Sequence, residues 1–561
     1  MPTRPRSRPW VLIAGLFAVF GILLAACGGS SGSGGGGGDA TSAESTTDVT
    51  VAASGAPTPG GSLAFGLEAE TDGFNPTSNR WAISGFMVAN AVFDPLAAYD
   101  ADGKAQPYLA KSFTPSADFK TWTIELRSGV TFHDGSPLTG AAVKKDLDAA
   151  RASLLVGAAM TNVASIEVDP ADPLKVVVTT VDPWASFPSS LTTQVGYIAA
   201  PAQLDATGDA ASRQPIGTGP FQQKSWVPDK AWTGTKYANY WRTDSNGTKL
   251  PYLDQVEFRP IVDHTNRGNA LVSGDLQMMH TTDWSVIKNL QSQAAAGKVQ
   301  IVFDRTESEE NFVLLNTTKA PLDDVRVRKA LALCTDREQL LQVWEMPNDR
   351  LADSQFASNS PWYDPNNGYP TLDVQAGTDL INQVKAEKGA VSLTLVTTPV
   401  PTNTAATQLL AQQWGQCGIN VQLSTSEQSK FISDAVTGNF QANLWRQFSS
   451  PDPDGDYHWW IGRNASGPLT LNMARVSDPQ VDAALNKARA SDDPAVRKQA
   501  YAELQERQSQ LLPYIWISHS QWAIGAAENV RNITNVSLPD GQPAQPFQSG
   551  NVRLTETWLQ N

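Results

Sequence analysis

The chain has few of the residues that most often carry enzymatic chemistry. Its 561 residues include five histidines and three cysteines, and the histidines are not spaced as metal ligands. A phosphate-binding Gly-x-x-x-x-Gly-Lys-Ser/Thr loop and a zinc-binding His-Glu-x-x-His motif are both missing, and Gly217-Thr218-Gly219 lacks the third glycine of a dinucleotide fingerprint. We therefore expect a protein that is not an enzyme and that holds neither a metal nor a cofactor.

Basic residues are in the minority. The chain carries 42 Lys and Arg against 56 Asp and Glu, which gives a net charge of −14. An acidic surface argues against nucleic acid or anionic lipid as the partner of the folded body. With 41% hydrophobic residues the composition is globular, and the length exceeds a single hydrophobic core, so more than one domain is expected.

The first 27 residues resemble an export signal. Three arginines precede an apolar run from Trp10 to Ala26, and the run ends in Leu-Ala-Ala before Cys27. A basic start, an apolar middle and small residues at a cleavage point are typical of a signal peptide. A cysteine at this point matches the bacterial lipobox, so residues 1–27 are predicted to be a lipoprotein signal that ends at the lipidated Cys27. An uncleaved membrane helix is the alternative, although the run is at the short limit for crossing a bilayer.

A flexible tether is predicted for residues 28–59. This stretch consists mainly of Gly, Ser, Thr and Ala and has almost no large apolar residue. Such a segment buries too little surface to offset the entropy lost on ordering.

Cys334 and Cys417 each lie in a segment with helical periodicity, at the end of an apolar stripe. Both thiols are therefore expected to face a core. Two buried free thiols are the first expectation, because buried cysteine commonly serves as a small apolar side chain. A disulfide is the alternative, since the predicted compartment outside the cytoplasm permits one.

The stretch from Tyr108 to Leu147 has the densest pattern. Trp122, Ile124 and Leu126 alternate with polar residues, which predicts a half-buried strand. His133-Asp134-Gly135 is typical of a turn, and a helix is expected to begin near Thr139.

This stretch closely resembles the signature of the family 5 solute-binding proteins of ABC importers, the group of oligopeptide, dipeptide and nickel receptors. The matching positions are Leu109, Ala110, Ser112, Phe113, Asp118, Trp122, Thr123, Leu126, Arg127, Val130, Phe132, His133, Asp134, Gly135 and Pro137. Further matches follow in order at 215–221, 239–241, 250–254, 316–336, 418–421 and 478–482. One departure is Ala142, where the family has an aspartate at the start of a helix, so its loss concerns capping.

The resemblance implies an α/β, two-lobed, periplasmic-binding-protein-like fold (type II, cluster C-like) with an extra inserted domain. The first lobe would be discontinuous, formed by residues 60–95, 216–305 and 518–561. Residues 96–215 would form the inserted small domain, and residues 306–517 the second lobe. The implied function is capture of a small solute in the cleft between the lobes, hinge closure and delivery to an ABC permease. We expect a monomer that is lipid-anchored to the outer face of the cytoplasmic membrane.

The resemblance also proposes ligand-binding residues. In the peptide receptors of the family, a tryptophan of the later lobe is followed three residues on by an aspartate that holds the amino group of the peptide. Trp445 matches this tryptophan, but the third residue after it is Phe448. Asp452 is a weaker candidate for a displaced cation partner, because an Asp-Pro pair is more often a turn or a helix cap. The loop from Asn75 to Trp81 matches the one that enters the cleft from the first lobe.

The sequence is compatible with several solutes and functions. A peptide is the first choice, an oligosaccharide is the second because the 17 tryptophans suit stacking on sugar faces, and nickel is the third. A secreted glycoside hydrolase would need two carboxylates that face each other across a sugar, whereas Asp452 and Asp454 fit a single turn. An adhesin-like lipoprotein would use an exposed surface instead of a cleft.

The assignment of Cys27 as the lipidated residue can be tested by removing its sulfur. In the native host, Cys27→Ala should move the protein from the membrane fraction to the medium or leave it as an unprocessed precursor, because the lipid attachment atom is gone. Fractionation with an antibody against the folded body measures this outcome. A processed Cys27→Ala protein that still fractionates with the membranes would contradict the assignment.

Overall fold

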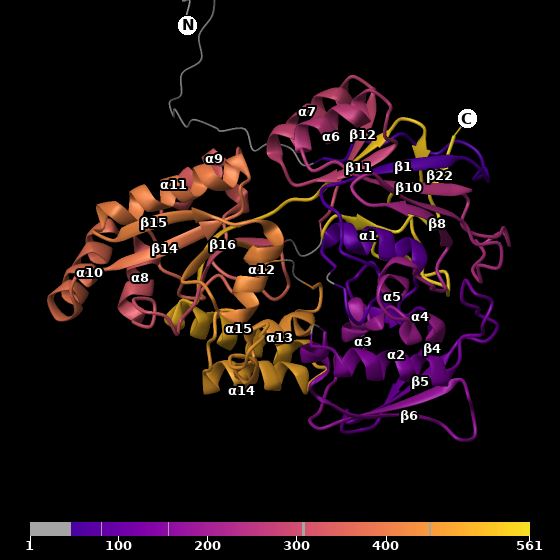
Figure 1. Ribbon diagram of the computed structural model, residues 1–561, viewed down its shortest axis with the longest axis horizontal. Helices are drawn as coiled ribbons and strands as arrows, with labels where there is room; N and C mark the ends of the chain where they lie inside the picture. The colour runs from indigo at the N-terminus through magenta and orange to yellow at the C-terminus, as the bar shows by residue number, and fades with distance from the viewer. Residues whose placement is uncertain (1–46, 80, 155, 306–308, 448–449, 561) are drawn as a thin grey trace, which may run out of the picture. The chain divides into compact units, whose positions relative to one another are not determined.

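The computed structural model describes residues 47–79, 81–154, 156–305, 309–447 and 450–560 (Figure 1). The predicted signal with Cys27, the beginning of the predicted tether and Phe448 lie outside the described residues. No helix within the described ranges has both the length and the apolar character that crossing a bilayer requires.

A seven-stranded mixed sheet is the centre of the first lobe. The central strand β1 (Ser62–Leu67) pairs in parallel with β10 (Gln255–Pro260) and with β11 (Met278–Thr281). The strand order is β12-β18-β11-β1-β10-β9-β8, so three distant parts of the chain meet in one sheet. The outer strands are β12 (Val299–Phe303), β18 (Ala523–Ala527), β9 (Ala231–Lys236) and β8 (Phe221–Val227).

A four-stranded antiparallel sheet is the centre of the inserted domain, with the order β4-β5-β7-β6. Its strands are β4 (Ala110–Pro115), β5 (Thr121–Leu126), β7 (Lys175–Thr180) and β6 (Val163–Val168). The predicted strand around Trp122 is β5, and its alternating pattern of burial confirms the prediction. The turn at Gly135, where φ is +84°, is also present, and α2 (Gly140–Ala152) begins directly after Thr139. The Thr139 hydroxyl accepts from the Ala142 amide, so this helix is capped without the family aspartate.

A five-stranded sheet is the centre of the second lobe, with the order β15-β14-β16-β13-β17. Its strands are β13 (Glu310–Leu315), β14 (Ser392–Thr397), β15 (Asn420–Thr425), β16 (Ala442–Gln447) and β17 (Tyr514–His519). Alternate residues of β13 serve two cores: Val313 packs with α8, α10 and α11, whereas Phe312 packs with helices that include α14 and α15. Figure 1 shows α10 and α11 along one side of this sheet.

Helices cover the three sheets, and many of them begin at an aspartate whose carboxylate accepts from a backbone amide of the first turn. Asp324, which the sequence predicts as a cap, accepts from the Arg326 amide at the start of α8. The helices are α1 (Ile83–Val92), α2 (Gly140–Ala152), α3 (Phe187–Ser190), α4 (Pro201–Asp205), α5 (Asp209–Arg213), α6 (His264–Val272), α7 (Trp284–Ala295), α8 (Val325–Leu333), α9 (Arg337–Val343), α10 (Val374–Lys388), α11 (Pro401–Gln416), α12 (Gln428–Thr437), α13 (Tyr457–Trp460), α14 (Pro479–Arg489) and α15 (Pro494–Leu511).

Short elements complete the fold. The 3₁₀ turns are η1 (Gly157–Met160), η2 (Gln194–Gly196), η3 (Asn348–Arg350), η4 (Pro453–Asp456) and η5 (Gly462–Asn464). The remaining strand pairs are β2 (Ala97–Tyr99) with β3 (Ala105–Pro107), β19 (Val530–Arg531) with β22 (Trp558–Leu559), and β20 (Phe547–Gln548) with β21 (Asn551–Val552).

The last part of the predicted tether is attached to the first lobe. Val49 forms an antiparallel bridge with Ile301, and each amide donates to the other residue's carbonyl at 2.9 Å. Asp48 accepts from the Phe303 amide and pairs with Arg305. Residues 48–51, within the predicted tether, are therefore bonded to the edge strand β12.

Cys334 and Cys417 form a disulfide, with their Cα atoms 6.5 Å apart. The prediction that both face a core is confirmed, because each residue is at most 1% exposed. The prediction of two free thiols is wrong. Helical periodicity shows which face of each helix is buried, but it does not show that the C-terminal ends of α8 and α11 meet.

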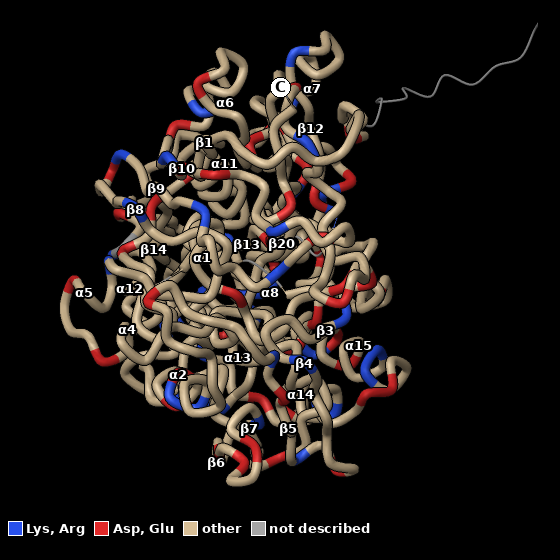
Figure 2. The backbone as a smooth tube through the Cα atoms, turned by 90° about the vertical axis from the view of Figure 1, so that its right-hand side faces the viewer, with Lys and Arg blue, Asp and Glu red and all other residues tan. Residues whose placement is uncertain are grey.

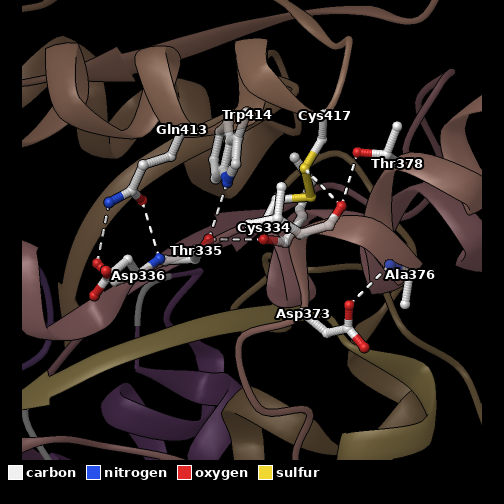
Figure 3. The surroundings of a disulfide bond; sticks show 11 residues. Cys334, Thr335, Asp336, Asp373, Ala376, Thr378, Gln413, Trp414 and Cys417 are labelled. Atoms are coloured by element: carbon white, nitrogen blue, oxygen red, sulfur yellow. Dashed lines mark hydrogen bonds between the residues drawn. A yellow bond between two sulfur atoms is a disulfide. The ribbon is translucent and has the colours of Figure 1, made fainter.

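Residues next to the two cysteines link the same helix ends (Figure 3). The Trp414 indole N–H donates to the Thr335 hydroxyl at 2.9 Å, and the Gln413 amide both donates to and accepts from the Asp336 backbone at 3.2 Å. The disulfide is thus one part of a larger contact that holds α8 and α11 together.

Reduction should destabilise the second lobe. The bond spans a sequence separation of 83 residues, and removing such a cross-link costs about 2–4 kcal/mol because the unfolded chain gains freedom. Urea denaturation of the oxidised protein, the reduced protein and Cys334→Ala/Cys417→Ala measures the loss. Two free thiols in unreduced protein, found by alkylation and mass mapping, would contradict the bond.

Candidate functional site

An arginine of the second lobe reaches the first lobe. Arg446 lies at the end of β16, and its Nη2 is 2.7 Å from Oε1 of Glu68, directly after β1. Nη1 donates to the Thr282 hydroxyl at 3.3 Å, and the guanidinium lies 5.5 Å from the ring centre of Trp522. Arg446 therefore joins the ends of β1 and β11 to the second lobe.

Glu68 is held by a neutral histidine as well as by Arg446. The Glu68 amide donates to Nε2 of His280, and Nδ1 of His280 lies 3.1 Å from the Gly550 carbonyl, which fixes the Nδ1–H tautomer. Burial lowers the pKa of His280 to about 4. Burial alone would raise the pKa of Glu68, but nearby positive groups, Arg446 foremost, hold that pKa below its ordinary value. Glu68 is thus an ionised partner of Arg446 at neutral pH.

Glu309 is the second carboxylate beside Arg446. Its Oε2 lies 3.2 Å from Nε of Arg446, and its side chain is 3% exposed. Burial raises the pKa of Glu309 to about 7, against the opposing effect of Arg446. The charge of this cluster therefore changes near neutral pH, from a balanced pair to a net negative site.

A small cavity lies inside the second lobe, against the sheet face formed by β13, β16 and β17. Its volume is about 20 Å³, which is room for about one water molecule. Its aromatic lining comprises Phe312, Trp459, Trp460, Tyr514 and Trp516. Its polar lining comprises Glu310, Gln355, Gln447 and Asp456. None of the described residues in this lining is a Lys, an Arg or a His.

The cavity walls are aromatic on one side and polar on the other. Phe312 makes edge contacts with Tyr514 and Trp516, each with ring centres 5.0 Å apart. Gln355 is 2% exposed, and neither of its amide atoms has a hydrogen-bond partner among the described residues. Because an unpaired buried amide is costly, a water or a ligand group is expected to bind it.

Trp445 borders this cavity through Gln447. The two side chains lie on the same face of β16, and the Trp445 indole N–H donates to Oε1 of Gln447 at 3.1 Å. The Trp445 ring stacks on Phe431 of α12, with ring centres 5.2 Å apart. Trp445 is half-buried, so one part of the ring remains accessible.

Asn75 and Trp81 are placed in the first lobe and are both buried. Oδ1 of Asn75 accepts from the amide and the hydroxyl of Thr77, which closes the loop on itself. Trp81 is 5% exposed, its indole N–H donates to the Gly73 carbonyl, and its ring stacks on Phe93. In these positions both residues support the loop.

Asp452 is bound on several sides. Arg497 donates to both of its carboxylate oxygens, at 3.0 and 2.5 Å, and the Ser189 hydroxyl donates to Oδ2 at 3.1 Å. Oδ1 also accepts from the Asp454 amide and caps η4. The turn-and-cap role that the sequence favours for this Asp-Pro pair is therefore present.

Sequence reasoning missed Arg446, Glu68, Glu309 and Gln355. Arg446 directly follows the predicted tryptophan, and Glu68 directly follows the first strand, so position along the chain was a usable signal for these two. Gln355 lies in a segment without periodicity, so no sequence signal pointed to it. Acidic and basic residues are interspersed along the described backbone, so charge patterning did not mark the site either (Figure 2).

The three sheets and the residues that join the two lobes define the class of a two-lobed binding protein. The model of the family of bacterial extracellular solute-binding proteins, family 5 (middle), matches residues 104–468, and the chain belongs to this family. Its members are binding proteins that act outside the cytoplasm.

Known proteins agree with this assignment. The glutathione-binding protein GsiB of Salmonella typhi is 27% identical over 444 residues, which are 75% of this chain and 81% of that protein. AgaA from A. tumefaciens R10, solved with agropinic acid, has a TM-score of 0.77 at 23% identity and covers 89% of this chain and 99% of its own. DppA from Helicobacter pylori, an ABC transporter-associated periplasmic binding protein solved with the peptide STSA, has a TM-score of 0.77 at 22% identity, with 90% and 99% covered. These two structures establish the fold.

The raised pKa of Glu309 predicts a pH dependence of stability. The folded carboxyl holds its proton up to about pH 7, whereas an unfolded glutamate loses it near pH 4.3, so the folded state loses stability as pH rises between these values. Glu309→Gln should remove this loss. The variant should gain about 2–3 kcal/mol relative to the parent between pH 4.5 and pH 8.

Urea denaturation at several pH values measures this difference. Glu503→Gln, which changes an exposed glutamate of the same lobe, is the matched control and should follow the parent. Parallel curves for the parent and Glu309→Gln would show that Glu309 titrates normally.

Proposed function

We propose that this protein is a lipid-anchored, monomeric receptor of an ABC importer, without catalytic activity, and that its solute carries a primary amine. A peptide is the first choice. The observation that carries the solute class is the cavity in the second lobe, whose lining combines acidic, amide and aromatic groups. The lipid would be attached at Cys27, and the permease would receive the solute at the outer face of the cytoplasmic membrane.

The size of the cavity favours an ammonium group. A volume of about 20 Å³ suits a small group of about the size of a water molecule. Glu310, at the start of β13, would be the counter-ion, and the amide oxygen of Gln355 would accept a further hydrogen bond. The surrounding ring faces favour a cation as well. Gln447, Trp459 and Leu471, the half-buried members of the lining, would form the entrance.

The predicted site residues receive different roles in this proposal. Trp445 would form the wall next to the entrance, because it holds Gln447 and keeps one part of its ring accessible. Asn75 and Trp81 would shape the opposite loop from within the first lobe. Asp452 is the weakest candidate, because Arg497 already neutralises its carboxylate.

The proposed division into lobes follows the sheets. Strands of residues 60–95, 216–305 and 518–561 form the seven-stranded sheet, and all four strands of the inserted sheet lie within 96–215. The five-stranded sheet uses residues 306–517 and the last two residues of β17.

An oligosaccharide is the second candidate. The half-buried Trp445 and Trp459 could stack on a sugar face, whereas the buried rings of Phe312 and Trp516 are occupied by each other. A neutral sugar would not depend on a negative charge at Glu310, which separates the two candidates.

A randomised tripeptide mixture and the same mixture N-acetylated are the probes for this proposal. The parent should retain free-amine peptides in native mass spectrometry and lose at least tenfold in affinity for the acetylated ones, because acetylation removes the charge. Glu310→Gln should also weaken the free-amine peptides by about tenfold, since a hydrogen bond to a charged group contributes about 1.5–3 kcal/mol. Glu503→Gln is the control and should bind like the parent.

Equal binding of free and acetylated peptides would refute the ammonium site while leaving the receptor role in place. Retention of an oligosaccharide that is indifferent to Glu310→Gln would favour the second candidate.

A further inference from the structure

The second lobe contacts the inserted domain at a place remote in sequence from the chain crossings. The chain passes between the two large sheets twice, between β12 and β13 and between β17 and β18. The contact joins Tyr99 and residues 184–189 of the inserted domain to residues 450–454 and Arg489 of the second lobe. Chain continuity therefore does not impose it.

Three hydrogen bonds of neutral donors cross this contact. The Trp184 indole N–H donates to Oδ2 of Asp454 at 2.5 Å, and the Ser189 hydroxyl donates to Oδ2 of Asp452 at 3.1 Å. The Ala185 amide donates to the Arg489 carbonyl at 2.8 Å. A hydroxyl pair, Tyr99 and Ser450, adds a fourth bond at 2.9 Å.

The charges at this contact are all paired inside the second lobe. Arg497 binds Asp452, and Nε of Arg489 lies 2.6 Å from Oδ1 of Asp454. Separation of the two surfaces would leave no buried charge without its partner, and water could replace the neutral donors. A contact built in this way can be broken at low cost.

Trp184 adds a cation–π contact to the hydrogen bonds. Its ring lies 4.3 Å from the guanidinium carbon of Arg489, which also covers Tyr457 at 3.3 Å. The ring belongs to the core of the inserted domain, with Phe187 and Trp122 as neighbours, so its position does not depend on the second lobe. Trp184 is thus a preformed surface on which Arg489 docks.

We propose that these two surfaces, Tyr99 with residues 184–189 and residues 450–454 with Arg489, form a clasp, which closes when the lobes close and separates when they open. Together with the Arg446–Glu68 pair near the crossings, the clasp sets the population of the closed state before any solute binds. For a solute that binds only the closed form, the apparent affinity is the intrinsic affinity multiplied by the fraction of molecules that are closed. The clasp therefore tunes affinity without contacting the solute.

Hydrogen exchange at the Ala185 amide reports the clasp directly, because its acceptor lies on the other surface. In the parent this amide should exchange more slowly than a free amide but faster than global unfolding allows. Ser189→Ala removes one crossing bond and should speed the exchange about tenfold. Ser190→Ala is the matched control, since this neighbouring buried serine donates to Phe187 within its own segment.

A second pair of variants covers the case in which Ser189→Ala does not fold. Tyr99→Phe removes the bond to Ser450 and should speed exchange at Ala185 in the same way. Its control is Tyr197→Phe, because the hydroxyl of Tyr197, also in the inserted domain, donates to Asn90 of the first lobe and not to the second lobe. Small-angle X-ray scattering of the solute-free protein should show a larger radius of gyration for Tyr99→Phe than for its control.

Three results would overturn the proposal. Free-amide exchange at Ala185 in the parent would mean that the contact does not form in solution. Exchange only through global unfolding, unchanged by Ser189→Ala, would mean a permanent interface. Equal acceleration by Ser189→Ala and Ser190→Ala would mean local weakening of the segment.

Discussion

The double passage of the chain between its two large sheets is the constraint on which the rest of the structure depends. Each passage carries a residue that lies against Arg446: Glu309 lies just before β13, and Trp522 lies between β17 and β18. The Asp304 amide donates to the Trp522 carbonyl at 3.0 Å, so the two passages are bonded to each other. Rotation of one lobe against the other must therefore occur around this pair of strands, and Arg446 lies beside it.

The interior of the second lobe follows from one strand. Because β13 lies between β16 and β17, its side chains separate the disulfide-containing core from the aromatic core and supply Glu310 to the cavity. Glu310 lies opposite Gln447 in the register of β13 with β16, so an acid and an amide that are remote in sequence become neighbours. A shift of this register by one residue would place every one of these groups on the other face.

Local features of the fold were predictable from the sequence, whereas features that join distant segments were not. Alternation identified β5, and Asp324 and Thr139 mark helix starts, because strands and caps depend on neighbours along the chain. The Cys334–Cys417 bond and the Arg446–Glu68 pair depend on contacts between separate elements, and no periodicity encodes them. The family signature supplied the two-lobed architecture and pointed to Trp445, but it could not show which neighbours the tryptophan has.

The disulfide has a consequence for how this protein is made. Thiols are kept reduced in the cytoplasm, while oxidation is possible once a chain has been exported. The second lobe can therefore complete its covalent structure only after translocation, and a precursor retained inside the cell would have a less stable version of that lobe. Export and maturation are coupled in this way, because the disulfide forms only on the oxidising side of the membrane. That is also the side on which the finished protein works.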